Sequence, residues 1–373
     1  MAERLRDSFG PEVIEWIASG LERAVPQFDR ETFVTDCGAG FDDLELMDRG
    51  RRIADVMADH LPGDPHVAVP MVAASLDPVD PELRGMAPFR YLPHVLFVGA
   101  HGLPAFEESM AAQYELTKRF TAEFSVRPFL VAHRDATLAR LHEWAADPDP
   151  HVRRLVSEGT RPRLPWAPRL REFVADPTPV LVLLELLKDD ESDYVRRSVA
   201  NNLNDISMDH PDLAVEVAGR WWADGDAQRR NLVRHGLRTL VKRGDPAALA
   251  VLGHARTDHV EVVATFVEPE AVRIGGSVRA GITLVDVRGP GSGPDERTAV
   301  DFVVHFVKAN GSTSARVFKG GVRDVAGGAE ATFTRTVSLA QLSTRRHYPG
   351  LHRVEAQVNG RRVPVGEFEL LAD

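Results

Sequence analysis

The chain has 373 residues, is 43% hydrophobic and 27% charged, and carries a formal net charge of −10. This length and composition predict about two ordinary globular domains, and the single cysteine, Cys37, excludes a disulfide scaffold and favours a reducing cytoplasm. The acidic balance argues mildly against a nucleic-acid partner, although the distribution of charge matters more than its sum. The first residues lack the apolar stretch of a signal peptide, and no run of about 18 apolar residues predicts a membrane span.

Residues 1–256 show helical spacing of their apolar residues and predict a helical domain. The segment 103–124 reads as one long helix that carries Glu123 near its end. Beyond residue 130 a pattern repeats, because Val152-Arg153-Arg154 returns as Val195-Arg196-Arg197, and a weaker third copy contains Arg229-Arg230. Helix pairs that repeat at roughly 33–47 residues are typical of an α-solenoid of HEAT-like repeats.

Residues 257–373 have the pattern of an all-β domain. Large apolar residues alternate along one run, at Val300, Phe302, Val304 and Phe306. Two Asn-Gly pairs, at 310–311 and 359–360, separate strand-like runs and predict hairpin turns. Short strands with regular turn signals predict an immunoglobulin-like β-sandwich, although this part lacks the cysteines and the tryptophan of antibody domains.

The repeated helices carry a second, polar face. Its residues recur at intervals of about four positions on the three copies: Arg154 and Glu158; Arg197, Asn201 and Asp205, with Asn204 beside them; and Arg230 and Arg234. Because equivalent positions of stacked repeats lie side by side, we expect one continuous, mainly basic surface. The loop after the first copy adds Arg161, Arg163 and Trp166, and prolines on both sides of the tryptophan stiffen this loop.

Two interpretations of this face stay open. Pairs such as Arg154 and Glu158 are common on helix surfaces, where they stabilise the helix and do nothing else. The density of basic residues in an acidic chain instead favours a polyanion, of which duplex DNA is the obvious example. Glu158 and Asp205 repel phosphate, so they indicate stabilisation of a developing cation, as in N-glycosidic bond cleavage. Trp166 would then contact the cationic base or sugar through a cation–π interaction.

Three segments, FTAEFSVRPFL (120–130), HVRRLVSEGTRPRLPWAPRL (151–170) and YVRRSVANNLNDISMDHPDL (194–213), closely resemble the AlkC branch of the HEAT-like-repeat DNA glycosylases, the AlkC/AlkD superfamily. The resemblance covers most of 100–255 and extends into the tail through STRRHYPGLHRVEAQVNG (343–360). It implies excision of N-alkylated bases, such as 3-methyladenine and 3-methylcytosine, from double-stranded DNA in base excision repair. It also implies that the base is not flipped into a pocket, unlike in most enzymes of this kind.

The resemblance further implies a set of site residues. The active-site carboxylates would be Glu158, Asp205 and Glu123, and only the resemblance supports Glu123, which precedes the clear repeats. Trp166 would be the aromatic contact, and phosphates or bases would be held by Arg154, Arg161, Arg163, Arg197 and Asn201. The sequence does not rank the three carboxylates, and Glu158 is preferred because it lies beside the rows of arginines.

The sequence contains no HExxH motif, no Cys/His cluster and no phosphate-binding glycine loop. We therefore expect a glycosylase without metal or organic cofactor. We also expect it to be a monomer in the bacterial cytoplasm, associated with the nucleoid when bound to DNA. Two alternatives stay open. A non-catalytic HEAT-repeat scaffold would show no salt-sensitive DNA affinity, and a DNA-damage-binding protein would bind DNA without releasing a base.

Overall fold

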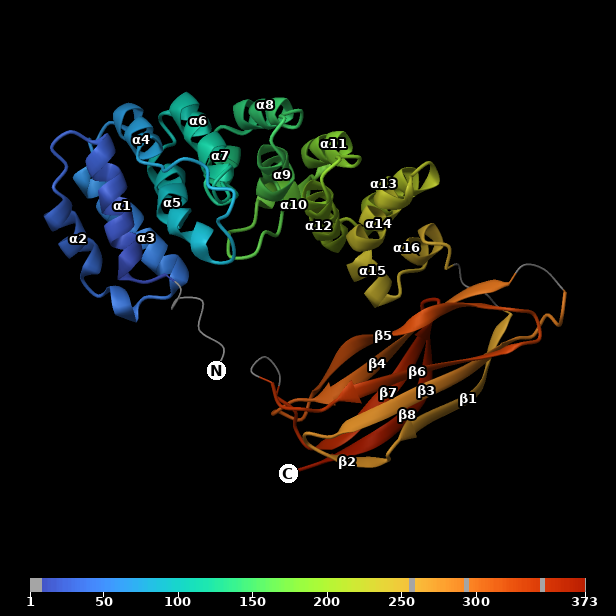
Figure 1. Cartoon of the computed structure of the whole chain (residues 1–373). Helices are drawn as coiled ribbons and strands as arrows, with labels where there is room; N and C mark the ends of the chain where they lie inside the picture. The colour runs from blue at the N-terminus through green and yellow to red at the C-terminus, as the bar shows by residue number, and fades with distance from the viewer. Residues whose placement is uncertain (1–8, 255–258, 292–294, 343–345, 373) are drawn as a thin grey trace. The chain divides into compact units, whose positions relative to one another are not determined.

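The computed structural model describes residues 9–254, 259–291, 295–342 and 346–372 (Figure 1). Its packing divides the chain into two compact units, Met1–Asp209 and His210–Asp373. The first unit is helical, and the second contains both helices and strands. The predicted domain boundary after residue 256 falls outside the described residues, so the division into 1–256 and 257–373 stays a prediction.

The first unit is a row of helices that follow one another in chain order (Figure 1). The α-helices are α1 (Pro11–Ala24), α2 (Arg30–Gly38), α3 (Leu46–His60), α4 (Pro65–Ala74), α5 (Leu92–His101), α6 (Phe106–Thr117), α7 (Val126–Ala132), α8 (Arg134–Trp144), α9 (Pro150–Gly159), α10 (Arg171–Ala175), α11 (Thr178–Leu187) and α12 (Asp193–Asp209). Short 3-10 helices lie at Phe41–Asp43 and Ala87–Tyr91. None of the described helices has both the length and the apolar content that crossing a membrane requires.

The start of α9 is fixed by local sequence. The Asp149 carboxylate accepts a hydrogen bond from the backbone N–H of His151 at 2.8 Å, and Pro150 lies in the first turn, where no intrahelical partner for its nitrogen is needed. α4 begins with the same Asp-Pro-His-Val sequence and the same type of cap. This cap also sets the position of Glu158, which lies about two turns further along the helix.

α9 and α12 pack against each other along their apolar faces. The fully buried side chains of this contact are Val152, Leu155 and Val156 on α9, and Val195, Val199, Leu203 and Ile206 on α12. Each contributes roughly 1.5–3 kcal/mol of hydrophobic stabilisation. α7 passes so close to the end of α9 that a Cβ atom at Gly159 would lie 2.5 Å from a methyl group of Val126. The polar side chains along the edges of α9 and α12 are therefore held close to one another.

The prediction of one helix over 103–124 is wrong in its last third. α6 ends at Thr117, and α7 begins only at Val126. In the loop between them, the Thr121 hydroxyl accepts a hydrogen bond from the backbone N–H of Glu123 at 3.2 Å. Side chains of this type compete with the helix for backbone partners. As a result, Glu123 lies on a loop and not on a helix surface.

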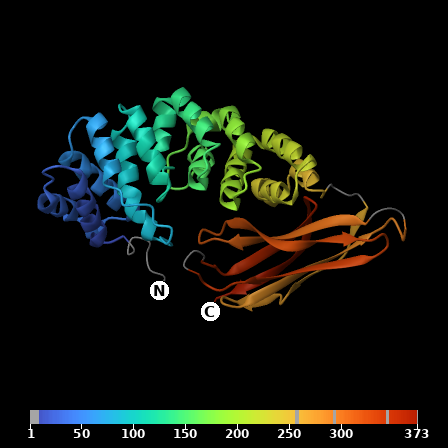
Figure 2. The ribbon, with the colours of Figure 1, turned by 45° about the horizontal axis from the view of Figure 1, so that its top comes forward.

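The second unit contains four described helices and two β-sheets. Its elements are α13 (Pro211–Ala223), α14 (Ala227–Gly236), α15 (Arg238–Arg243), α16 (Pro246–Val251), β1 (Val260–Glu268), β2 (Ala271–Arg273), β3 (Ser277–Asp286), β4 (Glu296–Val307), β5 (Thr313–Val325), β6 (Glu330–Ser338), β7 (Gly350–Val358) and β8 (Arg361–Leu371). One sheet has the order β1-β3-β6 and the other β2-β8-β7-β4-β5. The two sheets form the layers of a sandwich (Figure 2).

The strand prediction is confirmed in this unit. The alternating apolar residues predicted at 300–306 lie in β4 with their side chains buried in the core between the sheets. One Asn-Gly pair lies in the β4–β5 hairpin, and the other joins β7 to β8. Asn359 and Gly360 both have positive φ, of 41° and 86°, as a two-residue type I′ turn requires. The predicted order of helical repeats followed by a β-sandwich is thus observed.

Candidate active site

The carboxylates predicted near the first repeat gather around one cavity of the first unit. The cavity has a volume of about 340 Å³ and lies where α9 and the start of α12 meet the loops that follow α6 and α9. Its lining residues are Phe89, Phe120, Thr121, Glu123, Phe124, Arg154, Glu158, Arg161, Leu164, Pro165, Trp166 and Tyr194. Aromatic and apolar side chains therefore surround two carboxylates and two guanidinium groups.

Glu158 is held by donors on both of its carboxylate oxygens. It lies in the last turn of α9 and is only 6% exposed. The Arg161 guanidinium donates to Oε1 at 2.7 Å, and the Ser198 hydroxyl donates to Oε2 at 2.6 Å. Arg154 approaches Oε1 at 3.6 Å as a second cation. Because a protonated carboxyl group would have to give up one of these interactions, the arrangement favours the ionised form.

The pKa of Glu158 follows from two opposing effects. Burial raises the pKa of a carboxyl group, because it penalises the charged form. At Glu158 the charges of Arg154 and Arg161, with the Ser198 hydrogen bond, outweigh burial and hold the pKa below the ordinary value of 4.5. Glu158 is therefore a buried carboxylate that stays ionised at neutral pH.

Arg161 links Glu158 to Asp205. Its Nε donates to Oδ2 of Asp205 at 2.8 Å, and a terminal nitrogen donates to Oδ1 at 3.2 Å. Asp205 lies on α12, is 3% exposed and does not line the cavity. Its link to the cavity therefore runs through Arg161, whose guanidinium is itself buried between the two carboxylates.

Arg154 connects Glu123 and Tyr194 to the same cluster. A terminal nitrogen of Arg154 lies 2.9 Å from Oε2 of Glu123, and the Thr121 hydroxyl donates to that oxygen at 2.9 Å. The Arg154 guanidinium also lies over the Tyr194 ring, 5.2 Å from its centroid, in cation–π geometry. Glu123, which only the resemblance supports as a site residue, is thus held in the cluster by an arginine of α9.

The charges of the cluster are matched. Three carboxylates, from Glu123, Glu158 and Asp205, face the guanidinium groups of Arg154 and Arg161, and the charge of the buried Arg127 also acts on Glu123 and Asp205. The positive charges of these arginines are thus compensated by carboxylates, which makes the cluster a poor site for a phosphate group. Among the described residues, no group of three or more His, Cys, Asp or Glu side chains is arranged to hold a metal ion.

Trp166 lies at the rim of the cavity on an anchored loop. Its side chain is 56% exposed, and its backbone adopts the left-handed conformation with φ of 63°. The buried Arg127 side chain, from α7, donates hydrogen bonds to the carbonyl groups of Gly159, Arg161 and Pro168, at 2.5–3.2 Å. These three bonds hold both ends of the loop and so fix where the exposed indole stands.

Comparisons with known proteins show which family this chain belongs to. Residues 261–372 match a family model described as the C-terminal Ig-like domain of the uncharacterised protein YhaZ. The uncharacterised protein YhaZ of Bacillus subtilis (strain 168) is 34% identical over 361 residues, which cover 95% of this chain and 96% of that protein. The structure of Pseudomonas fluorescens alkylpurine DNA glycosylase AlkC bound to DNA containing an abasic site analog superimposes with a TM-score of 0.88 at 35% identity, over 99% of this chain and 100% of that one. This chain belongs to the AlkC family. Its second part is accordingly an Ig-like sandwich.

Other predicted site residues of this AlkC-family chain lie outside the lining of the cavity. Arg163 forms a two-point ion pair with Asp209, at 2.5 and 2.8 Å. Arg197 is exposed on α12, while Asn201 is partly buried and Asn204 buried on the same helix. Arg230 and Arg234 lie on α14 in the second unit, each within 5.4 Å of the centroid of the Trp222 ring.

Sequence reasoning missed four residues that shape this candidate site. They are Tyr194, Ser198, Ser157 and Arg127. The sequence does contain a signal for Ser198, because the repeat alignment makes it equivalent to Leu155, a core residue of α9. A serine at a core position of a repeat indicates a buried polar partner. No comparable signal marks Arg127, whose partners are backbone carbonyl groups.

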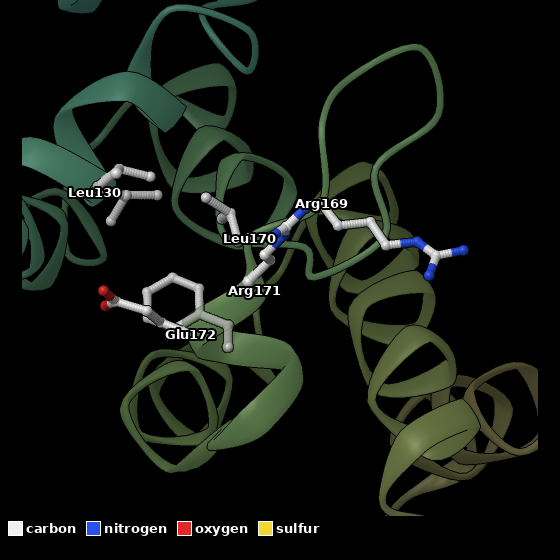
Figure 3. A pocket seen from close by; sticks show the side chains of 7 residues that line it. Leu130, Arg169, Leu170, Arg171 and Glu172 are labelled. Carbon is white, nitrogen blue, oxygen red and sulfur yellow. The ribbon is translucent and has the colours of Figure 1, made fainter.

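A mainly apolar cavity of about 400 Å³ shares Phe124 and Trp166 with the carboxylate cavity. A smaller neighbour of about 210 Å³ lies beside it, lined by residues of α7, α10 and the loop before α10 (Figure 3). In Figure 3 the Arg169 side chain extends away from Leu130 and Leu170. Arg169 is exposed and forms no ion pair with any of the residues that the structure describes.

Proposed function

We propose that this chain is a DNA glycosylase that hydrolyses the N-glycosidic bond of N-alkylated, cationic bases, such as 3-methyladenine and 3-methylcytosine, in double-stranded DNA. The observation that carries the proposal is the ionised Glu158, held by Arg161 and Ser198 in a cavity that has the exposed Trp166 at its rim. The similarity to AlkC supports it, because that protein is an alkylpurine DNA glycosylase and its structure holds DNA with an abasic site analog.

The chemistry of such a reaction matches the charges of the cavity. Cleavage of an N-glycosidic bond passes through an oxocarbenium-like transition state, so positive charge develops on the sugar. A preorganised carboxylate stabilises this charge without having to reorganise during the reaction. The alkylated base is cationic before cleavage and leaves as a neutral molecule. The Trp166 indole is suited to contact the cationic base or the sugar by a cation–π interaction.

The two carboxylates that line the cavity are suited to different roles. Glu158 accepts hydrogen bonds on both oxygens, which makes it a fixed negative charge for the developing cation. Glu123 contacts the Thr121 hydroxyl and the Arg154 guanidinium through Oε2. We propose that Glu123 Oε1 positions the attacking water. Asp205 acts at a distance, by holding Arg161 against Glu158.

The substitution Glu158→Gln tests this function, because it keeps the shape of the side chain and removes its charge. We expect affinity for DNA to change only slightly, while single-turnover release of the alkylated base falls by about a hundredfold or more. Binding is measured by fluorescence anisotropy with a duplex that contains one alkylated base, and release by chromatography of the freed base.

The matched control is Glu115→Gln on α6. Glu115 also forms ion pairs, with Lys118 and Arg119, but it does not line the cavity. We expect this variant to release the base at the wild-type rate. Release at the wild-type rate by Glu158→Gln would remove Glu158 from the mechanism, and DNA binding without release by the wild-type chain would indicate a damage-binding protein.

A further inference from the structure

A chain of two serine hydroxyls ends on the Glu158 carboxylate. The Ser157 hydroxyl lies 2.6 Å from the Ser198 hydroxyl, which lies 2.6 Å from Oε2 of Glu158. Ser157 and Glu158 are neighbours on α9, and Ser198 projects from α12. Both serines are fully or almost fully buried. The contact between Ser198 and Glu158 therefore joins two helices across their packed interface.

The direction of these hydrogen bonds follows from the chemistry of the groups. An ionised carboxylate only accepts hydrogen bonds, so the single hydroxyl hydrogen of Ser198 points to Glu158. Ser198 can then only accept from Ser157, whose single hydroxyl hydrogen has two acceptors in reach, the Ser198 hydroxyl at 2.6 Å and the Arg154 carbonyl at 3.1 Å. The shorter contact makes Ser157 the donor behind Ser198. An O–H···O⁻ distance of 2.6 Å is typical of a charge-assisted hydrogen bond. The two serine hydroxyls thus both donate in the direction of the carboxylate, which favours its ionised state.

The backbone at the end of α9, which carries Ser157 and Glu158, is also held by α12. The Asn202 side-chain amide, also from α12, donates to the carbonyl of Ser157 at 2.8 Å and to the hydroxyl of Thr160 at 3.1 Å. Asn202 is fully buried. It therefore fixes the last turn of α9, where Glu158 lies, to the same helix that supplies Ser198.

The repeat alignment shows that the serine is not needed to build a helix of this type. Ser198 of α12 corresponds to Leu155 of α9, which is buried in the apolar core. A leucine at 198 would add apolar contact area but leave Oε2 of Glu158 without its donor. An unsatisfied buried carboxylate oxygen costs more than a typical hydrogen bond contributes.

We propose that Ser198 is a positioning residue that holds the Glu158 carboxylate in its reactive orientation, with Ser157 as the donor behind it. This inference rests on the proposed glycosylase function, because it assigns Ser198 a role in that reaction. Ser198 contacts Glu158 and does not line the cavity, so it acts on the substrate only through the carboxylate.

The charged and titratable groups that face Glu158 bear on any test by pH. They are Arg154 on α9, Arg161 on the following loop, Tyr194 on α12, Glu123 on the α6–α7 loop and, through Arg161, Asp205. All of them remain in place when only Ser198 is changed. A shift in the pH dependence of a Ser198 variant therefore reports on the lost hydroxyl and not on a lost charge.

The test compares wild-type protein with Ser198→Ala in single-turnover release of 3-methyladenine from methylated duplex DNA, across about pH 3.5–8, a range that extends below the ordinary glutamate pKa of 4.5. We expect the rate at neutral pH to fall about tenfold or more, with DNA affinity unchanged. The hydroxyl favours the ionised carboxylate, so its loss raises the pKa of Glu158. The decline of the rate on acidification should therefore begin at a higher pH in the variant.

Three further variants separate positioning from simple packing. Ser198→Thr restores a hydroxyl and should recover most of the rate. Ser198→Cys nearly keeps the volume of the side chain but offers only a weak donor. It takes the place of Ser198→Ala if the alanine variant does not fold, and the same loss of rate is expected. Ser207→Ala removes another buried serine of α12, whose hydroxyl donates to the Asn204 carbonyl, and should leave release unchanged.

Two results would overturn the inference. One is a wild-type rate and pH dependence in Ser198→Ala. The other is a loss of rate with an unchanged pH dependence and no recovery in Ser198→Thr, since that pattern describes a packing residue. If the wild-type protein itself releases no base from alkylated DNA, the proposed function fails, and this outcome is distinct from both.

Discussion

The arginines near the cavity fall into two groups that differ in what they contact. Arg154, Arg161 and Arg163 contact carboxylates at short range. Arg169 and Arg197 are exposed and form no ion pair with the described residues. The resemblance assigned phosphate contacts to Arg161 and Arg163. Since their charges are already neutralised by partners, we infer that Arg161 positions carboxylates and that Arg169 and Arg197 are better placed to meet phosphates.

This division predicts the salt dependence of DNA binding. Each phosphate contact steepens the fall of log K with log salt concentration by about 0.9. We expect Arg169→Ala and Arg197→Ala each to reduce this slope by about one, and Arg163→Ala to leave it nearly unchanged. All three changes alter the net charge equally, so a difference between them reports contact. A reduced slope in Arg163→Ala alone would show that its pair with Asp209 opens on DNA.

Single residues of the site were predictable where a repeat or an unusual residue type exposed them. Glu158 and Trp166 were found because one interrupts a basic helix face and the other stands between prolines, and both line the cavity. The partners of the arginines were not predictable. Asp209 lies 46 positions from Arg163, and the sequence does not indicate which side chains a two-helix contact brings within 3 Å.

At the scale of elements, one buried side chain contacts both ends of the loop 160–170, in addition to the ion pairs that tie Arg161 and Arg163 of this loop to α12. Arg127 supplies hydrogen bonds to three carbonyl groups at the two ends of this loop, which carries Trp166 and Arg161. Carbonyl groups that lose a buried donor cost about 1–3 kcal/mol each if they stay buried. The position of the indole and the bridge between Glu158 and Asp205 therefore both rest on α7.

We expect Arg127→Met to loosen this loop and to reduce base release by more than its loss of stability explains. The control is Arg49→Met, because Arg49 on α3 is also buried and donates to three backbone carbonyl groups, at Phe9, Asp42 and Leu44. Both variants should lower the melting temperature, but only Arg127→Met should speed hydrogen exchange in 160–170 and slow release. Equal effects on release would contradict the proposed role of the loop.

Elements were predictable where apolar spacing and caps agreed. The stripes on α9 and α12, and the two Asn-Gly hairpins, were all found in the structure. The segment 103–124 failed because its composition suits a helix, whereas α6 ends at Thr117 and the side chain of Thr121 binds the backbone at Glu123 in the loop that follows. Such local competition is not visible in apolar spacing, and it decides where Glu123 lies.

At the scale of the whole molecule, the net charge of −10 and a DNA partner are compatible because charge is distributed unevenly. The order of helical repeats and Ig-like sandwich followed from the sequence pattern, since repeats and hairpin turns are strong local signals. The domain boundary after residue 256 stays a prediction, because it falls outside the described residues. The packing places α13–α16 in one unit with the strands, and spacing along the chain does not reveal such contacts.

The most direct measurement is base release by the wild-type protein. Duplex DNA that carries 3-methyladenine or a single 3-methylcytosine is incubated with the protein, and freed bases are separated by chromatography. We expect release of the alkylated base from a double-stranded substrate, and no release of normal bases from undamaged DNA. DNA binding without release would contradict the catalytic claim, and the absence of both would favour a non-catalytic scaffold.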